Sequence, residues 1–352
     1  KYTTEFFYDA AVASPASPLL AVQNSQLLIG CANGDTVAQN EATIFFVAQA
    51  KVSGQAARRG YFVARMEGMT YKVVSTPDID RLLNVDGLSG AWATVLSLFG
   101  HNLYVLNIPA TTISLAYDLN NGLWYYLTVQ TASTAVSVTA LTSAADGDTA
   151  GTATATAASH GFADGDPITI AGATPSGYNG TFNITYVSAN SFTYPVSSVL
   201  ATATGTITAT GNSSSYFPIL TAFQYENLQV FQDRATGHIY QFDDALYTDN
   251  GAYIDWKIRT AQVERGEGPN QTNEQKFLPW VDVITDRASQ SMLLRQVDDD
   301  YVTPSNYRKV SLSGQRSRLN RLGGFTRRAF ELRHTDNGAM RFQGLDIPVE
   351  QG

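Results

Sequence analysis

The densest group of chemically capable side chains lies near the C-terminal end of the chain. Residues 316–333 contain one acidic residue, Glu331, and six arginines: Arg316, Arg318, Arg321, Arg327, Arg328 and Arg333. A guanidinium can bind a carboxylate or a phosphate through two parallel hydrogen bonds, and arginine is enriched at interface hot spots. We therefore interpret the six arginines as a candidate subunit or partner interface. A solvated face balanced by acids elsewhere, and contact with nucleic-acid phosphates, are the alternatives.

Closely spaced aspartates form a second candidate group. They occur as three Asp-x-Asp pairs and one triplet: Asp78/Asp80, Asp146/Asp148, Asp164/Asp166 and Asp298–Asp300. Paired carboxylates can bind calcium or act as the acid and base of a glycosidase. A calcium loop needs further ligands at regular spacing, and these do not follow in the sequence. We therefore interpret the aspartates as turn residues.

Motifs for other chemistry are absent from the sequence. It contains no nucleophile elbow, phosphate loop, zinc-protease motif or dinucleotide-binding glycine pattern. The four histidines are far apart in sequence, and we interpret each as a surface or turn residue: His101, His160, His238 and His334. Cys31 is the only cysteine, which excludes an internal disulfide and predicts a small buried side chain. We predict no catalytic, cofactor-binding or metal-binding residue, and no enzymatic activity.

Charge is scarce and unevenly distributed. The 352 residues are 44% apolar and only 15% charged, with a formal net charge of −8. Residues 82–233 contain no Lys or Arg and eight acids: Asp86, Asp118, Asp146, Asp148, Asp164, Asp166, Glu226 and Asp233. Tight binding to duplex DNA requires cations at the phosphates, so this stretch is not suited to gripping DNA.

The two ends and the apolar runs give little information about location. No run approaches 18 uncharged apolar residues, so no transmembrane helix is predicted. The chain begins at Lys1 without Met or a signal-peptide pattern, and we expect that it lacks its natural N-terminus.

The sequence predicts that mainly β-strands position these side chains. Short β-branched and aromatic runs such as 43–47, 61–64 and 102–106 are bounded by turn residues at spacings typical of a sandwich, barrel or propeller. A loosely repeated strand–turn–strand pattern includes residues 118–124, in which Gly122 supplies a positive φ before Trp124 packs between sheets. We predict an all-β fold with a β-propeller-like body. Trp124, Tyr125 and Tyr126 are favoured as core residues over a sugar-binding platform.

A middle segment has a different composition. Residues 133–213 are rich in Thr, Ala, Ser and Gly, and alternation is strict in the runs 160–170, 178–187 and 190–194. Asn179-Gly180 is a type I′ hairpin signal. We predict an inserted small β-barrel or sandwich module at 133–213, between a propeller-like region at 1–132 and a propeller-like continuation with a C-terminal β region at 214–352.

Two segments carry a resemblance to a known family. The run from His160 to Tyr194 resembles a small β-module that recurs in tailed-phage structural proteins. The run from Gly314 to Leu332 resembles the C-terminal part of podovirus tail nozzle proteins, also called tail tubular protein B or packaged-DNA-stabilisation proteins. The turn at 118–124 is similar to turns of that family's β-propeller. The similar parts cover about two thirds of the chain, which shows only three clear blade-like repeats.

The resemblance implies a structural role in the virion tail. It implies a homohexameric ring below the portal and its adaptor, in contact with tail fibre or needle proteins, that retains genomic DNA and then conducts it during ejection. DNA would pass through without sequence-specific binding, and no cofactor is implied. The alternatives are a carbohydrate-binding adhesion module of a phage tail or cell surface, with its aromatic, Asp and Asn residues on the inserted module, and a glycan-degrading enzyme on a propeller.

Overall fold

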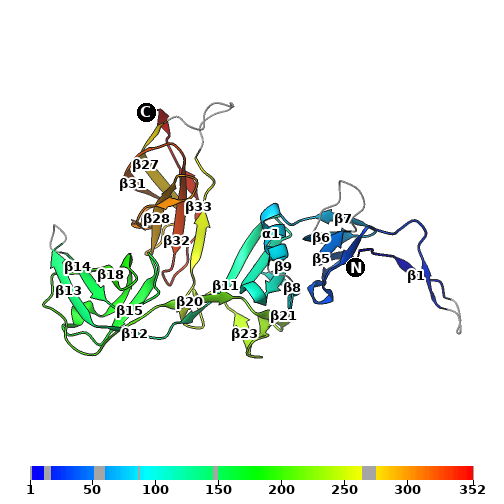
Figure 1. The fold of residues 1–352 in the computed structure, drawn as a ribbon, viewed down its shortest axis with the longest axis horizontal. Helices are drawn as coiled ribbons and strands as arrows, with labels where there is room; N and C mark the ends of the chain where they lie inside the picture. Colours follow the sequence, from blue (N-terminus) through cyan, green and yellow to red (C-terminus); the bar gives the residue numbers. More distant parts are fainter. Residues whose placement is uncertain are drawn as a thin grey trace. The chain divides into compact units, whose positions relative to one another are not determined.

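Short β-prone runs separated by turn residues fold, in this computed structural model, into many small antiparallel sheets (Figure 1). The structure describes residues 2–11, 17–50, 60–85, 88–145, 150–263 and 275–351. Within them the one α-helix is α1 (Pro77–Val85), and the short 3-10 turns are η1 (Gly34–Thr36), η2 (Pro109–Thr111) and η3 (Ser176–Tyr178). The predicted all-β fold is therefore confirmed. No helix in the described part is long and apolar enough to cross a membrane.

The chain forms two compact units, each made of two separate stretches of sequence. Unit 1 comprises residues 1–129 and 215–244, and unit 2 comprises residues 130–214 and 245–352. Residues 215–244 thus group with the N-terminal part of the chain, while the middle segment groups with the C-terminal part.

Unit 1 is built mainly from antiparallel meanders. One sheet has the order β3-β5-β6-β7 with β4 beside β5: β3 (Ile29–Cys31), β4 (Ala38–Asn40), β5 (Thr43–Ala50), β6 (Tyr61–Glu67) and β7 (Thr70–Val73). A second has the order β20-β11-β10-β9-β8: β8 (Trp92–Leu98), β9 (His101–Ile108), β10 (Ile113–Asp118), β11 (Trp124–Ala132) and β20 (Asn212–Tyr216). Sequential antiparallel strands of this kind are what propeller blades are made of.

Two smaller sheets complete unit 1. The three-stranded sheet contains β21 (Ile219–Tyr225), β22 (Leu228–Asp233) and β23 (Ile239–Phe242). The two-stranded hairpin contains β1 (Phe7–Asp9) and β2 (Leu19–Ala21). A bridge between Thr4 and Leu27 holds the base of this hairpin beside β3.

Aromatic packing forms the core of unit 1. The rings of Phe45 and Tyr104 stack with centroids 5.1 Å apart, and Tyr117 packs against Phe45 and Trp124. The Trp124 indole donates a hydrogen bond to the Val74 carbonyl (2.8 Å), so this ring is anchored in the core as predicted. Gly122, before it, has a φ of +74°, as the sequence predicts. The predicted core placement of Tyr125 and Tyr126 is wrong, because both side chains are exposed.

The middle segment of unit 2 is a sandwich of two four-stranded sheets. One has the order β12-β19-β15-β16: β12 (Val136–Val138), β15 (Pro167–Ala171), β16 (Gly180–Asn183) and β19 (Ile207–Thr210). The other has the order β13-β14-β18-β17: β13 (Ala140–Ala145), β14 (Gly151–Thr156), β17 (Thr185–Ser188) and β18 (Ser191–Val196). Leu141, Ile168, Tyr178, Phe192 and Tyr194 fill the space between the sheets.

The predicted type I′ hairpin at Asn179-Gly180 is wrong. Asn179 ends η3 with a φ of −80°, and Gly180 begins β16. The Asn179 side chain instead accepts from the Ala173 N–H (2.9 Å) and donates to the Ala173 carbonyl (2.8 Å). An Asn side chain that satisfies two backbone groups closes the loop without the turn that the Asn-Gly pair suggests.

The C-terminal part of unit 2 pairs strands that are distant in sequence. One sheet has the order β26-β32-β28-β29 with β30 beside β28: β26 (Trp256–Arg259), β28 (Ser291–Asp298), β29 (Thr303–Pro304), β30 (Arg308–Ser311) and β32 (Arg328–His334). The other has the order β31-β27-β33 with β34 beside β27: β27 (Lys276–Thr285), β31 (Arg316–Phe325), β33 (Phe342–Asp346) and β34 (Glu350–Gln351). The two-stranded ribbon is β24 (Thr248–Asp249) and β25 (Ala252–Tyr253). Leu278, Val283, Leu294 and Phe330 lie in the core of this part.

A substitution at Gly172 tests whether the close approach of this residue to the Thr206 carbonyl stabilises the middle sandwich. A Cβ at Gly172 would lie 2.1 Å from the Thr206 carbonyl oxygen, and the φ of +81° is unfavourable for other residues. We expect Gly172→Ala to lower the free energy of unfolding by about 2 kcal/mol or more in urea denaturation. Gly161→Ala is the matched control, because Gly161 has a φ of +71° but open space around its Cβ. Equal effects of the two substitutions would show that the close approach to Thr206 contributes nothing.

Candidate functional site

The six predicted arginines lie on two strands and the turn between them. Arg316, Arg318 and Arg321 belong to β31, Arg327 lies in the turn, and Arg328 and Arg333 belong to β32. All seven residues of β32 are buried, because β32 is hydrogen-bonded between β26 and β28. The arginines of this strand must therefore find partners within the protein.

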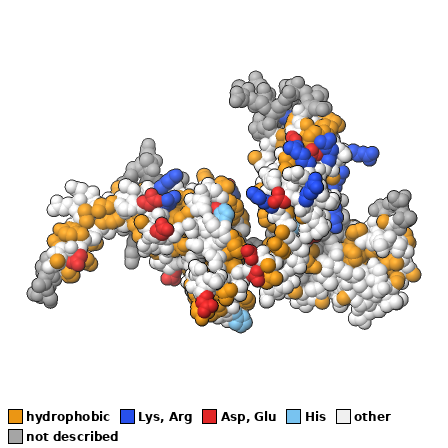
Figure 2. All heavy atoms as spheres, turned by 180° about the vertical axis from the view of Figure 1, so that it is seen from behind, with side chains coloured by type: hydrophobic (Ala, Val, Ile, Leu, Met, Phe, Trp, Pro, Cys, Tyr) orange, Lys and Arg blue, Asp and Glu red, His pale blue; other side chains and the backbone are white. Residues whose placement is uncertain are grey.

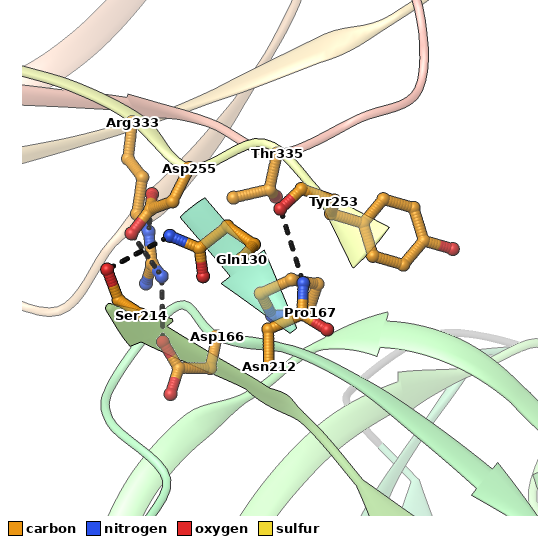
Figure 3. Close-up of a pocket in the computed structure, with 9 residues that line it drawn as sticks. All are labelled: Gln130, Asp166, Pro167, Asn212, Ser214, Tyr253, Asp255, Arg333 and Thr335. Carbon is orange, nitrogen blue, oxygen red and sulfur yellow. Dashed lines mark hydrogen bonds and ion pairs between the residues drawn. The ribbon is translucent and has the colours of Figure 1, made fainter. Parts of the chain in front are cut away.

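Arg333 is the centre of a polar cluster inside unit 2 (Figure 3). Its side chain is 7% exposed. It makes a two-pronged pair with Asp255, with Nε to Oδ1 at 2.7 Å and Nη2 to Oδ2 at 3.1 Å. Nη2 also donates to Asp166 Oδ1 (2.7 Å), and Nη1 donates to the Asp164 carbonyl (3.1 Å). Two groups of the middle sandwich, the Asp166 carboxylate and the Asp164 carbonyl, thus converge on one guanidinium with the Asp255 carboxylate from the segment before β26.

A small cavity of about 160 Å³ lies beside this cluster, and its lining is polar: Gln130, Asp166, Pro167, Asn212, Ser214, Tyr253, Asp255, Arg333 and Thr335. Most of these polar groups bond to one another or to neighbouring residues. The Gln130 side chain donates to Ser214 Oγ (3.1 Å), and the Asn212 side chain donates to the Tyr253 carbonyl (3.2 Å). Thr335 Oγ1 accepts from Asn183 (3.1 Å). Because Arg333 is occupied by two carboxylates, the cavity does not present it to an external anion.

Electrostatics keep the guanidinium charged. Burial favours the neutral form, but the carboxylates of Asp255 and Asp166 raise the pKa of Arg333 above its ordinary value. A buried charge is tolerated only when it is paired and hydrogen-bonded, and both conditions hold here. The cluster therefore links the middle sandwich to the C-terminal strands of unit 2 through buried ion pairs.

Glu331, on the same strand, is the centre of a second buried network. Its side chain is 1% exposed and accepts from Arg259 Nε (2.9 Å) and from the Tyr307 hydroxyl, while Arg295 Nη2 lies 2.6 Å from Oε1. Burial alone would raise the pKa of Glu331, but the hydrogen bonds from Tyr307 and Arg259 and the charges of both arginines hold it at about 2. The Tyr307 hydroxyl correspondingly has a raised pKa, because it is buried and faces this carboxylate.

Four of the other arginines also have carboxylate partners. Arg328 pairs with Asp298 and Arg318 with Asp282, each through two hydrogen bonds of 2.7–2.9 Å, while Arg316 pairs with Asp346 and Arg327 with Asp300. The Arg318 pair lowers the pKa of the Asp282 carboxyl, and the guanidinium also lies 3.8 Å from the Trp280 ring centre. Arg321 is exposed and has no ion-pair partner among the described residues. Figure 2 shows cationic side chains gathered over the C-terminal strands of unit 2.

Three of these partners, Asp166, Asp298 and Asp300, are among the aspartates that the sequence marks as turn residues, whereas Asp255, Asp282 and Asp346 are not. Asp164, Asp166, Asp298 and Asp300 all contact arginine through a side chain or backbone carbonyl. The sequence places the acids and the arginines in different segments and gives no signal for their pairing. Asp78 and Asp80 lie in the first turn of α1, and Asp86, Asp146 and Asp148 lie outside the described residues.

Two histidines are buried, so their predicted surface or turn placement is wrong. His160 Nε2 lies 2.9 Å from the Ser188 carbonyl while Nδ1 accepts from the Phe162 N–H. His334 Nδ1 lies 3.0 Å from the Ser291 carbonyl. Both rings are used for backbone hydrogen bonds. Cys31 is half-buried, and burial raises the pKa of its thiol. No group of three metal-ligating side chains occurs in the described ranges.

No protein-family model matches this chain, and no curated protein matches it either.

Arg333→Lys should weaken the contact between the middle sandwich and the C-terminal strands of unit 2. Lysine keeps the charge but cannot bind Asp255 and Asp166 through a planar fork. We expect the free energy of unfolding to fall by about 3 kcal/mol, as when other buried ion pairs are broken. Urea denaturation monitored by tryptophan fluorescence measures this loss. Arg321→Lys, at an exposed position, is the control and should leave stability unchanged. If Arg333→Lys also left stability unchanged, the Arg333 ion pairs would not hold the two parts of unit 2 together.

The low pKa of Glu331 predicts a dependence of stability on pH. Because the folded pKa of about 2 is below the ordinary value of 4.5, the ionised Glu331 contributes its full stabilisation above pH 4.5. That contribution is lost as the pH falls from 4.5 toward 2. Glu331→Gln should lower the melting temperature at neutral pH and make it less sensitive to acid. Thermal melts at several pH values, with Glu226→Gln as an exposed control, test this; parallel profiles for wild type and Glu331→Gln would refute it.

Proposed function

We propose that this chain is a structural subunit of the short tail of a tailed phage. Copies of it would form a nozzle ring, a homohexamer, below the portal and its adaptor and next to the tail fibre or needle proteins. The ring would retain the packaged genome and then conduct it during ejection. The resemblance of residues 160–194 and 314–332 to phage tail proteins supports this proposal, and the all-β fold is compatible with it.

The observation that carries the proposal is the apolar hairpin β1–β2. Its large side chains are exposed on both faces: Phe7 (54%), Tyr8 (51%), Leu19 (54%) and Leu20 (45%). Tyr8 lies opposite Leu20 on one face, and Phe7 and Leu19 lie on the other. An isolated two-stranded hairpin is at best marginally stable in water. Contact with another chain would bury these side chains and stabilise the hairpin.

A different apolar surface lies elsewhere in unit 1. On the three-stranded sheet β21-β22-β23, Phe223, Leu228 and Ile239 are exposed, as is Tyr225 at the end of β21. When two different apolar surfaces of one chain bind each other between copies, the contact is head-to-tail, and such contacts form a ring when the rotation from copy to copy closes. The hairpin of one copy against the β21–β23 face of the next is the contact we propose.

The distribution of cations is compatible with a DNA conduit. Five of the six arginines at 316–333 are paired with carboxylates of the same chain, and residues 82–233 contain no Lys or Arg. DNA binding depends on cations that are free to replace counterions at phosphates. Paired arginines and a cation-free stretch would let DNA pass without being held. Arg328 and Arg333 are buried, so the proposed partner contacts of this group rest on Arg316, Arg318, Arg321 and Arg327.

Substitution of the hairpin tests the proposed assembly. We expect the purified wild-type chain to form a ring of about 230 kDa from six copies of 38.1 kDa, visible by negative-stain microscopy and by mass measurement. The double variant Tyr8→Ser/Leu20→Ser should be monomeric, because it removes apolar contact area from the proposed interface. Its melting temperature should match that of the wild-type chain at concentrations where the wild type is monomeric, since both side chains are exposed in the single chain.

Leu123→Ser is the control for this experiment. Leu123 is also exposed, but it lies outside both apolar surfaces, so this variant should assemble like the wild type. A wild-type chain that stays monomeric at every concentration, or a hairpin variant that assembles normally, would rule out the proposed contact.

A further inference from the structure

An open pocket of about 440 Å³ in unit 1 has a lining that combines polar and aromatic side chains. It lies where the β8–β9 turn meets the three-stranded sheet β21-β22-β23. Its lining combines four amide side chains, two carboxylates and two phenylalanines: Phe99, Gly100, Gln224, Asn227, Gln229, Gln241, Phe242, Asp243 and Asp244. None of these nine residues is a Lys, Arg or His. The tail function proposed above does not use this pocket.

Phe99 is held in a conformation that its residue type disfavours. It is the first residue of the two-residue turn between β8 and β9, with a φ of +50°, followed by Gly100 with a φ of +85°. Asn, Asp and Gly are the residues that suit this turn position, whereas a bulky aromatic residue there is an outlier. The ring is also 61% exposed, so core packing does not explain it. Strained residues of this kind are concentrated at binding sites.

Two glutamines opposite each other in the sheet give the pocket hydrogen-bond acceptors. Gln224 of β21 is paired in register with Gln229 of β22. The Gln224 side-chain nitrogen donates to the Glu226 carbonyl (3.2 Å), and the Gln229 nitrogen donates to the Ser97 carbonyl (2.9 Å). These bonds fix the direction of each amide, and no described residue donates to either side-chain oxygen. With the carboxylate of Asp244, the pocket offers mainly acceptors.

The ligand that fits an acceptor-rich, cation-free lining is rich in hydroxyl donors and carries no negative charge. A phosphate or a carboxylate would meet the Asp244 carboxylate and no cationic lining residue, so repulsion disfavours anionic ligands. A sugar ring has hydroxyl groups around its edge and an apolar C–H face that can lie on an aromatic ring. From this lining and the strained, exposed Phe99, we propose that the pocket binds a neutral oligosaccharide, with one sugar ring on Phe99 and its hydroxyls donating to Gln224, Gln229 and Asp244.

This site lies on the sheet that also carries the proposed subunit contact, but on its other face, because Gln224 and Gln229 alternate along their strands with Phe223 and Leu228. The pocket residues also lie outside the β1–β2 hairpin. A carbohydrate-binding role was one alternative suggested by the sequence, but there it was assigned to residues of the middle segment. The pocket places the candidate site in unit 1 instead.

Phe99→Asn separates binding from folding. Asparagine suits the first position of this turn better than phenylalanine, so the variant should be at least as thermally stable as the wild type. Titration calorimetry and saturation-transfer NMR should be run on the full chain with neutral oligosaccharides of glucose, galactose, mannose and N-acetylglucosamine. We expect at least one to bind with an affinity that is insensitive to salt between about 50 and 500 mM. Phe99→Asn and Asp244→Ala should each weaken this binding by about tenfold.

Tyr126→Asn is the matched control, because Tyr126 is an exposed aromatic residue of unit 1 outside the pocket. This variant should bind like the wild type. Spermidine serves as a cationic probe for the two carboxylates. The proposal is overturned if no oligosaccharide binds at about 10 mM. It is equally overturned if spermidine binds and no sugar does, or if Tyr126→Asn abolishes binding while Phe99→Asn does not.

Discussion

The pairing of the buried Arg333 with two carboxylates is the interaction on which the organisation of unit 2 depends. Asp166 comes from the middle sandwich and Asp255 from the segment leading into β26, and each is separated from Arg333 by a long stretch of chain. A buried guanidinium is tolerated only with its partners, and buried carboxylates are equally costly without theirs. Neither half of unit 2 can therefore reach its native arrangement around this cluster without the other. This explains why a segment with its own hydrophobic core groups with the C-terminal strands.

The same requirement changes the meaning of the arginine-rich stretch. In the sequence it is a strongly basic run, yet five of its six arginines are paired with acids from other parts of unit 2. Paired in this way, they reinforce strand contacts and offer little free charge to a polyanion. Most of the arginines in this region therefore stabilise the fold through a carboxylate partner. The electrostatic character of the surface thus follows from tertiary pairing and cannot be read from local composition.

Local sequence signals predicted the parts of the fold that local physics controls. The strands at 43–47, 61–64 and 102–106, the all-β class and the positive φ of Gly122 follow from β propensity, burial patterns and turn chemistry. Asn179 does not form the predicted type I′ turn, because its side chain hydrogen-bonds to both the N–H and the carbonyl of Ala173. His160 and His334 are buried, in contrast to their predicted surface or turn placement, because a ring nitrogen of each finds a backbone carbonyl as a partner inside the protein. The partners of Arg333 lie 78 and 167 residues away, and no periodicity in a single sequence encodes such a pairing.

Where residues violate the rules that the rest of the chain obeys, the violation itself carries information. In unit 2 the buried Arg333 is paired with carboxylates, and large aromatic residues such as Tyr178, Phe192 and Phe330 lie in cores. Unit 1 carries two features of this kind: a hairpin with apolar side chains on both faces, and an exposed phenylalanine in a turn position that favours asparagine or glycine. Each lowers the stability or solubility of an isolated chain, so folding alone does not account for either. A chain whose local preferences otherwise agree with its fold keeps such exceptions where other molecules make contact. The two exceptions differ in kind, since an extended apolar arm suits another protein surface whereas a single ring beside amides suits a small polar ligand.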